Sequence, residues 1–196
     1  LAAVASGLYV GWRAPQLASP STRLLGFSFW EVLVYLANAV LFLASSASAY
    51  MTGVSGGGWT TTIYSAVDPR ITRSYPVAGS LPLHLREDKK RSNTAHRAAD
   101  WGDYEQTIPE LYAVANYLDL YILSSVGEGR KQLQILNKND PCCLAGESFR
   151  TYEGVINDRV KGLGGGTFAV YLDTKNTHHA ISRTALDVML NDINNN

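Results

Sequence analysis

The sequence lacks an excess of charge of either sign. Among its 196 residues, 17 lysines and arginines balance 17 aspartates and glutamates, so the formal net charge is zero. Proteins that bind nucleic acid normally carry a basic excess or a basic patch, because the phosphate backbone is polyanionic. The balance therefore argues against a nucleic-acid partner. Hydrophobic residues make up 46% of the chain, so most of it is expected to fold.

Cysteine is also scarce. The only two, Cys142 and Cys143, are neighbours in the sequence, which excludes a scaffold built on disulfides. Adjacent cysteines rarely bridge each other, so two reduced thiols are expected. A zinc site would need a spaced pair of cysteines with further histidine or cysteine ligands. The sequence shows no such spacing, and we expect neither a metal nor an organic cofactor.

One long stretch has very little charge. Leu24–Ala44 contains a single formal charge, Glu31, and a bilayer core requires about 20 mainly apolar residues. The stretch therefore predicts either a membrane helix, through which the chain would associate with a membrane, or a buried core helix, which Glu31 favours. The chain begins at Leu1 rather than at methionine, so we expect a fragment or a processed product.

From Ser45 onward, strand-like stretches alternate with helix-like stretches. This alternation is typical of an α/β domain with a mostly parallel sheet and flanking helices. The helix expected over Pro109–Leu120, for example, has apolar residues at i, i+3, i+4 and i+7. The expected strands are Ala47–Thr52, Tyr75–Ala78, Gln132–Leu136 and Thr167–Leu172, and the other expected helices are Trp59–Ala66, Tyr152–Leu163 and Ile181–Ile193.

A serine stands in the glycine-rich turn that follows the first of these strands. Gly53, Ser55 and Gly57 match the pattern Gly-x-Ser-x-Gly, and a helix-compatible stretch follows. This strand–turn–helix setting is that of a nucleophile elbow, in which small neighbours make room for a strained serine. The alternatives are a turn with an incidental serine and a phosphate-binding loop, which would require a lysine after the glycines. We predict that Ser55 is a nucleophile and that Gly53 and Gly57 supply the room.

A serine nucleophile needs a base, and the base needs a carboxylate that orients it. After an elbow serine the expected chain order is serine, acid, histidine. His178 and His179 follow the last predicted strand, and His179 is preferred because it lies closer to the closing helix. Asp140 is the preferred acid, because it follows the third predicted strand and Pro141 behind it enforces a turn. Asp173, at the end of the last strand, is its rival.

From Met51 to Ile193 the sequence resembles an α/β-hydrolase of an esterase- or peptidase-like branch. The segments that carry the resemblance are TGVSGGGWTT, NDPCC and YLDTKNTHHAIS, and they occur in the order typical of that family. The resemblance implies Ser55 as nucleophile, Asp140 as acid and His179 as base, with the N–H of Gly56 in the oxyanion hole. It also implies an ester or a peptide as the substrate and no cofactor.

Leu1–Leu43 resembles part of a cation/proton antiporter of the sodium–hydrogen exchanger type, over the stretch from GLYVGWRAPQ to VLFL. We therefore expect an antiporter-like apolar helical segment over 1–44 and the C-terminal part of an α/β-hydrolase domain over 45–196. α/β-hydrolases normally have several strands before the elbow, and a loop there supplies the second oxyanion donor. Antiporter-like sequence in their place predicts a chimeric chain, or a fragment joined at about Ala44–Ser48. It also predicts an exposed sheet edge and poor activity, because one missing oxyanion donor costs about 10²–10³ in rate.

The sequence thus predicts a serine hydrolase that cleaves an ester or amide bond through an acyl-enzyme, incomplete in this chain. Two other functions fit the same residues. One is a fragment of a membrane cation/proton antiporter, and the other is a catalytically inactive α/β-hydrolase-like binding module. Covalent labelling of Ser55 by a fluorophosphonate distinguishes the hydrolase from both.

Overall fold

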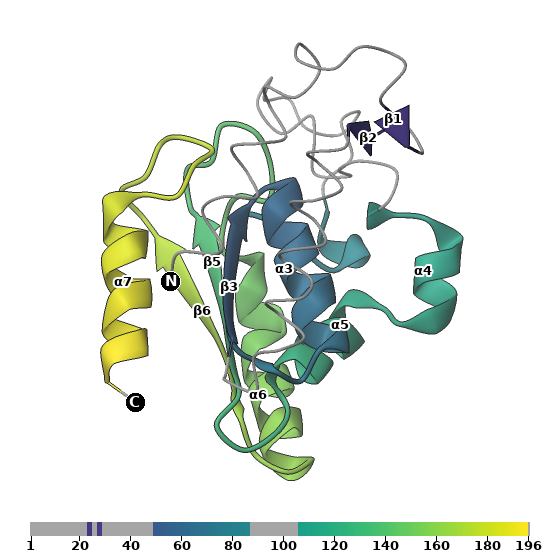
Figure 1. Cartoon of the computed structure of the whole chain (residues 1–196). Coiled ribbons are helices and arrows are strands. Elements are labelled where there is room, and N and C mark those ends of the chain that lie inside the picture. The colour runs from purple at the N-terminus through teal and green to yellow at the C-terminus, as the bar shows by residue number, and fades with distance from the viewer. Residues whose placement is uncertain (1–22, 25–26, 29–48, 87–105, 196) are drawn as a thin grey trace. The chain divides into compact units, whose positions relative to one another are not determined.

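A computed structural model of the chain describes residues 23–24, 27–28, 49–86 and 106–195 (Figure 1). The chain divides into two compact units, Leu1–Ser48 and Ala49–Asn196. The described residues of the first unit form an antiparallel pair, β1 (Arg23–Leu24) with β2 (Phe27–Ser28). Leu24, Phe27 and Ser28 belong to the helix predicted over 24–44 but lie in these strands, so the prediction is wrong at these residues. The other residues of that predicted helix lie outside the described residues. Within the ranges that the structure describes, no helix has the length and apolar character needed to span a bilayer.

The second unit is built on a four-stranded parallel sheet. Its strands follow one another across the sheet in chain order: β3 (Ala49–Val54), β4 (Ile71–Val77), β5 (Lys131–Asn137) and β6 (Thr167–Asp173). The main helices around it are α3 (Gly56–Val67), α5 (Tyr117–Ser125), α6 (Glu153–Gly162) and α7 (Arg183–Asn194). Short 3₁₀ turns occur at Leu83–Leu85 and Ser148–Thr151. The predicted α/β fold with a parallel sheet and flanking helices is confirmed.

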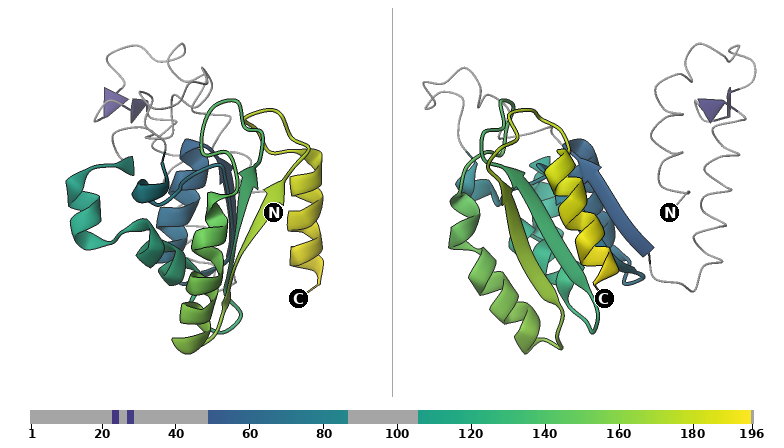
Figure 2. Two further views of the ribbon diagram at one scale, coloured as in Figure 1. Left: turned by 180° about the vertical axis from the view of Figure 1, so that it is seen from behind. Right: turned by 90° about the vertical axis from the view of Figure 1, so that its left-hand side faces the viewer.

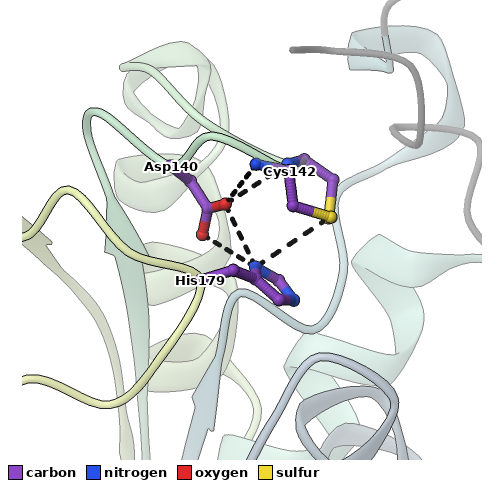
Figure 3. A group of neighbouring side chains, drawn as sticks. Asp140, Cys142 and His179 are labelled. Carbon is purple, nitrogen blue, oxygen red and sulfur yellow. Dashed lines mark hydrogen bonds and ion pairs between the residues drawn. A yellow bond between two sulfur atoms is a disulfide. The ribbon is translucent and has the colours of Figure 1, made fainter.

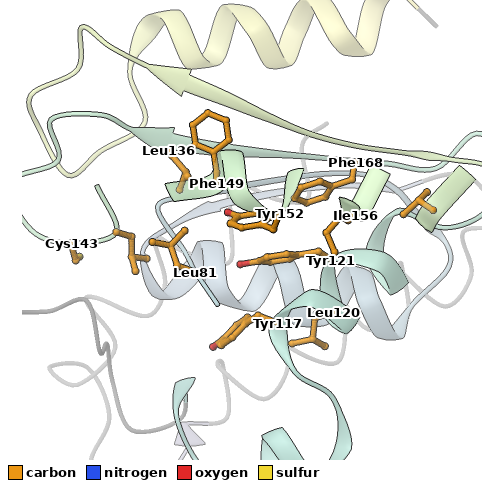
Figure 4. Close-up of a cluster of buried hydrophobic side chains, with 12 residues drawn as sticks. Leu81, Tyr117, Leu120, Tyr121, Leu136, Cys143, Phe149, Tyr152, Ile156 and Phe168 are labelled. Carbon is orange, nitrogen blue, oxygen red and sulfur yellow. The ribbon is translucent and has the colours of Figure 1, made fainter. Parts of the chain in front are cut away.

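The helices cover both faces of the sheet (Figure 2). Right-handed crossovers between strands that advance in one direction place their helices on one face. Accordingly α3, α5 and α6 share one face, and α7 packs against the other. Alternate residues of β6 show the division, because Phe168 packs on the side of α5 and α6 whereas Ala169 and Tyr171 pack on the side of α7. Tyr121 stacks on both Tyr152 and Phe168 at the centre of the larger core (Figure 4).

β3 lies at one edge of this sheet. Among the strands that the structure describes it pairs only with β4, and all of its residues from Ala49 to Val54 take part in that ladder. The other side of β3 therefore presents backbone N–H and C=O groups without a strand partner in the described sheet. An exposed edge at the strand before Ser55 is what the sequence predicts.

The single helix predicted over Pro109–Leu120 is two helices in the structure, α4 (Pro109–Val114) and α5. Asn116 begins the second one, because its side-chain oxygen accepts from the N–H of Leu118 at 2.8 Å and of Asp119 at 3.1 Å. The Asp119 carboxylate accepts in return from the Asn116 N–H at 3.1 Å. Such a reciprocal capping box starts a helix. The apolar period continues across the break, so periodicity alone predicts one helix.

Candidate active site

Ser55 occupies the turn between β3 and α3. Its φ of 58° and ψ of −123° belong to a strained region that non-glycine residues seldom adopt. Two backbone hydrogen bonds hold it there: the Ser55 N–H donates to the Val77 oxygen at 3.0 Å, and the Trp59 N–H donates to the Ser55 oxygen at 2.9 Å. The half-buried Ser55 hydroxyl caps no backbone N–H of α3. The turn therefore has the backbone geometry of a nucleophile elbow, with a hydroxyl that the helix does not use.

Glycines let the chain pass close to itself at this turn. A Cβ on Gly53 would lie 2.5 Å from the backbone of Gly57, and a Cβ on Gly58 would lie 2.6 Å from the Val77 oxygen. A Cβ on Gly57 would meet nothing within 4 Å. The prediction that Gly53 and Gly57 both have to be small is therefore right for Gly53 and wrong for Gly57. A side chain at position 53 would collide with the backbone of Gly57, whereas a side chain at position 57 would collide with nothing. The second close approach is made by Gly58, where α3 packs on β4 and on Gly79.

Alanine at position 58 is expected to destabilise the fold by about 1–3 kcal/mol, because its Cβ would force α3 away from β4. Gly57→Ala is the matched control one residue earlier in α3. Position 57 has room, and alanine has the higher helix propensity, so stability should rise by up to about 1 kcal/mol. Urea unfolding followed by circular dichroism measures both changes. A loss of stability in Gly57→Ala as large as that in Gly58→Ala would contradict this packing.

Asp140 lies in the turn after β5, and its side chain is fully buried, with 0% exposed. Backbone N–H groups of Cys142 and Cys143 donate to Oδ1 at 2.9 and 3.3 Å. The side-chain amide of Asn137 donates to Oδ2 at 3.3 Å. These three donors fix the orientation of the carboxylate.

The ring of His179 faces this carboxylate (Figure 3). His179 Nδ1 lies 2.9 Å from Asp140 Oδ2 and 3.1 Å from Oδ1, and 22% of the histidine side chain is exposed. A carboxylate accepts hydrogen bonds, so Nδ1 carries the proton and Nε2 is the acceptor of the neutral ring. Nε2 is buried and has no hydrogen-bond partner among the residues that the structure describes. Asp140 thus fixes the orientation of the His179 ring, and the second nitrogen of the ring keeps a lone pair that can accept a hydrogen bond.

The two rival residues are placed differently. His178 is exposed, and its Nδ1 lies 3.5 Å from the hydroxyl of the preceding threonine. Asp173 is buried, and its carboxylate accepts from the Ser182 hydroxyl and from two backbone N–H groups of the following turn. Burial raises the pKa of the Asp173 carboxyl, but these hydrogen bonds outweigh burial and hold the pKa below its ordinary value. Asp173 therefore anchors the loop that carries His179 and the start of α7.

Two asparagines, Asn137 and Asn139, join the Asp140 loop to the His179 loop, and a third, Asn176, forms a hydrogen bond within the histidine loop. Asn137 donates from Nδ2 to Asp140 and also to two backbone oxygens of the histidine loop, each at 3.3 Å. Asn139 and Asn176 donate to backbone oxygens of the histidine loop at 3.1 and 2.9 Å. These bonds position Asp140 and His179, and no sequence motif indicates them. Their only signal is that asparagines occur in both LNKND and TKNTHH.

Cys142 and Cys143 form a disulfide, so the expectation of two reduced thiols is wrong. Neighbouring side chains point to opposite sides of an extended chain, but residues 141–144 form a series of bends, and Leu144 has a φ of 55°. Cys143 Sγ lies 4.0 Å from His179 Nδ1. The disulfide therefore lies directly beside Asp140 and His179, and the four side chains of this cluster are of the types that bind metal ions.

The sequence-predicted residues follow three parallel strands. Ser55 follows β3, Asp140 follows β5 and His179 follows β6, and the carboxyl ends of parallel strands meet at one edge of a sheet. The structure brings Asp140 and His179 into contact, whereas the unpartnered Nε2 means that the ring has no hydrogen bond to Ser55. Gly56 is the first residue of α3, where backbone N–H groups have no partner within the helix.

Comparisons with known proteins add little to this picture. No family model matches the chain, and no curated protein matches it. Similar solved structures include a Klebsiella pneumoniae protein described as a dienelactone hydrolase, with 13% identity and a TM-score of 0.45, and an acetyl xylan esterase from Paenibacillus sp. R4, with 16% identity and a TM-score of 0.45. These matches cover 84% and 93% of this chain but only 60% of each of those chains. The comparisons give no support to the antiporter resemblance of the first 43 residues.

Proposed function

We propose that this chain acts as a serine hydrolase, which cleaves an ester or amide bond of a small molecule or peptide through an acyl-enzyme. The observation that carries the proposal is the state of His179. Its Nδ1 is bound to a fully buried carboxylate at 2.9 Å, while its Nε2 is buried without a partner. A histidine oriented in this way is a general base, and Ser55 on its strained turn belongs to the same edge of the sheet.

In the proposed reaction, His179 Nε2 takes the proton from Ser55 Oγ as this oxygen attacks the carbonyl carbon of the substrate. The carbonyl oxygen becomes an oxyanion, which the Gly56 N–H and the N-terminal dipole of α3 stabilise. The protonated histidine then gives its proton to the leaving alcohol or amine as the C–O or C–N bond breaks. Water attacks the acyl-enzyme in the same way and releases the acid. Asp140 stays ionised throughout and stabilises the imidazolium.

A fluorophosphonate tests this proposal, because it phosphonylates an activated serine. Cleavage after Tyr50 and Trp59 releases residues 51–59, in which Ser55 is the sole serine, so mass spectrometry locates the adduct. We expect the adduct on this peptide. Asp140→Asn should slow its formation by about 10³–10⁴, because the amide no longer holds His179 with its proton on Nδ1.

Asp173→Asn is the matched control, since it changes a second buried carboxylate that anchors the same loop without binding the His179 ring. Labelling should stay close to the wild-type rate, while the fold loses stability. Because the pKa of Asp173 is lowered in the folded chain, its stabilising contribution is present at neutral pH and disappears as the pH falls through that lowered pKa. An adduct outside peptide 51–59, or equal losses of labelling in the two variants, would refute the proposed roles.

A further inference from the structure

Four side chains that carry potential metal ligands lie close together: the two cysteines of the disulfide and the neighbouring aspartate and histidine. One ligand atom each from Asp140, Cys142, Cys143 and His179 lies within 4.8 Å of all the others. His179 Nδ1 is 2.9 Å from Asp140 Oδ2 and 4.0 Å from Cys143 Sγ. In a tetrahedral zinc site, bond lengths near 2.0–2.3 Å place the donor atoms roughly 3.3–3.8 Å apart. The cluster is therefore close to the spacing that such an ion requires.

We propose that reduction of the Cys142–Cys143 disulfide turns this cluster into a binding site for a thiophilic divalent cation such as Zn²⁺. The donor set is two thiolates, one imidazole nitrogen and one carboxylate oxygen, which is a set that zinc accepts. In the disulfide the two sulfurs are uncharged and bonded to each other, so the site exists only in the reduced chain. Cys142 and His179 are half-buried, which leaves the ion a route from solvent.

The redox step is a two-electron reduction. A dithiol, or a phosphine in the experiment, supplies the two electrons and is itself oxidised, while two protons from water complete the two thiols. When the cation binds, both thiols release these protons to solvent. The chain therefore binds the metal only after the disulfide has been reduced, and its affinity for the metal increases with pH.

The same cation switches off the proposed hydrolase, and this consequence rests on that function. An ion on His179 Nδ1 leaves the proton of the neutral ring on Nε2. Nε2 is then a donor and does not accept the proton of Ser55. The oxidised chain keeps its base free, whereas the reduced chain loses it when zinc is present.

Cobalt binding tests the site without any enzymatic reaction, because thiolate ligation to Co²⁺ gives an intense near-ultraviolet absorption band. The chain is reduced with a phosphine, freed of excess reagent and titrated with Co²⁺ and then with Zn²⁺. Reduced wild type and reduced Ser55→Ala should develop the band with one equivalent of Co²⁺ and lose it to Zn²⁺. The oxidised wild type should show no band.

Variants assign the ligands. The Cys142→Ser, Cys143→Ser double variant should give no band, and His179→Ala should bind Co²⁺ at least about tenfold more weakly. His178→Ala, which removes the adjacent exposed histidine, should bind as the wild type does. Circular dichroism checks that each variant folds. If a variant does not fold, the site is tested by comparing the cobalt bands of the oxidised and reduced wild type. Absence of the band in the reduced wild type, or full affinity in His179→Ala, would overturn the site.

Labelling of Ser55 separates the site from its consequence. Reduced wild type saturated with Zn²⁺ should react with the fluorophosphonate at least about 100-fold more slowly than the same reduced chain without metal. A cobalt band without this slowing overturns the inhibitory role and keeps the metal site. Absence of labelling in every form of the wild type refutes the proposed hydrolase, while the cobalt titration still decides the metal site.

Discussion

Alanine in place of Ser55 is expected to abolish fluorophosphonate labelling and to lower ester hydrolysis by about 10⁶-fold. The hydroxyl is the atom that forms the acyl-enzyme in the proposed mechanism. It caps no N–H of α3, and alanine tolerates a φ of 58° about as poorly as serine does. Stability should therefore change by less than about 0.5 kcal/mol. Initial rates on p-nitrophenyl acetate, adduct mass and thermal unfolding measure the three effects.

Thr60→Ala provides the control for this loss of activity. The Thr60 hydroxyl lies one turn further along the same helix and donates to the Gly56 oxygen at 2.9 Å. Its removal disturbs the start of α3 without removing the nucleophile, so labelling of Ser55 should persist. Hydrolysis by Ser55→Ala at the wild-type rate would exclude Ser55 as the nucleophile. Equal losses in both variants would show instead that the helix start, not the hydroxyl, is what matters.

The elements that the sequence predicts well are those fixed by local pattern. Phe168, Val170 and Leu172 alternate with Ala169 and Tyr171 along β6, and the two sets pack on opposite faces of the sheet. The elbow is also local, because a strand, a turn and a helix follow one another around Ser55. The boundary between α4 and α5 is not fixed in this way, since the capping box at Asn116 competes with an apolar period that continues across it.

The contact between Asp140 and His179 could be predicted because the order of strands decides which loops meet. Asp140 and His179 lie 39 residues apart, yet both follow strands that are neighbours in a parallel sheet. The disulfide and the bonds of Asn137 could not be predicted. They depend on the path of the irregular segments after β5 and β6, in which residues 141–144 form bends and Leu144 has a φ of 55°.

For the same reason, the cluster that we propose to bind a cation could not be predicted from the sequence. Its ligands come from one turn after β5 and one loop after β6, and neither segment contains a spaced cysteine–histidine pattern. Asp140 and His179 belong both to the proposed catalytic machinery and to the proposed metal site. The proposed hydrolase needs His179 Nε2 as a proton acceptor, and a cation on Nδ1 would leave the proton on Nε2. One molecule therefore cannot bind the cation and catalyse hydrolysis at the same time.

Alanine in place of His179 should lower kcat/KM for ester hydrolysis by about 10⁴–10⁶-fold, whereas His178→Ala should hydrolyse at nearly the wild-type rate. The two residues are adjacent, but only the ring of His179 binds Asp140. The His178 ring is exposed, and the backbone of His178 supplies its hydrogen bonds to the loop. Its oxygen accepts from Asn137 and from the Ala180 N–H, and its N–H donates to the Asn176 side chain, so alanine keeps these bonds. Rates, adduct mass and unfolding are measured for both variants in parallel.

The pH dependence of the residual rate distinguishes loss of the base from damage to the fold. Without an imidazole, the proton of Ser55 passes to hydroxide, so the remaining activity of a folded His179→Ala chain should rise about tenfold per pH unit. A misfolded chain would show no such slope in its Ser55-dependent rate. If His178→Ala loses the rate and His179→Ala keeps it, the base has been assigned to the wrong ring. The contact between His179 and Asp140 would then serve only to hold two loops together.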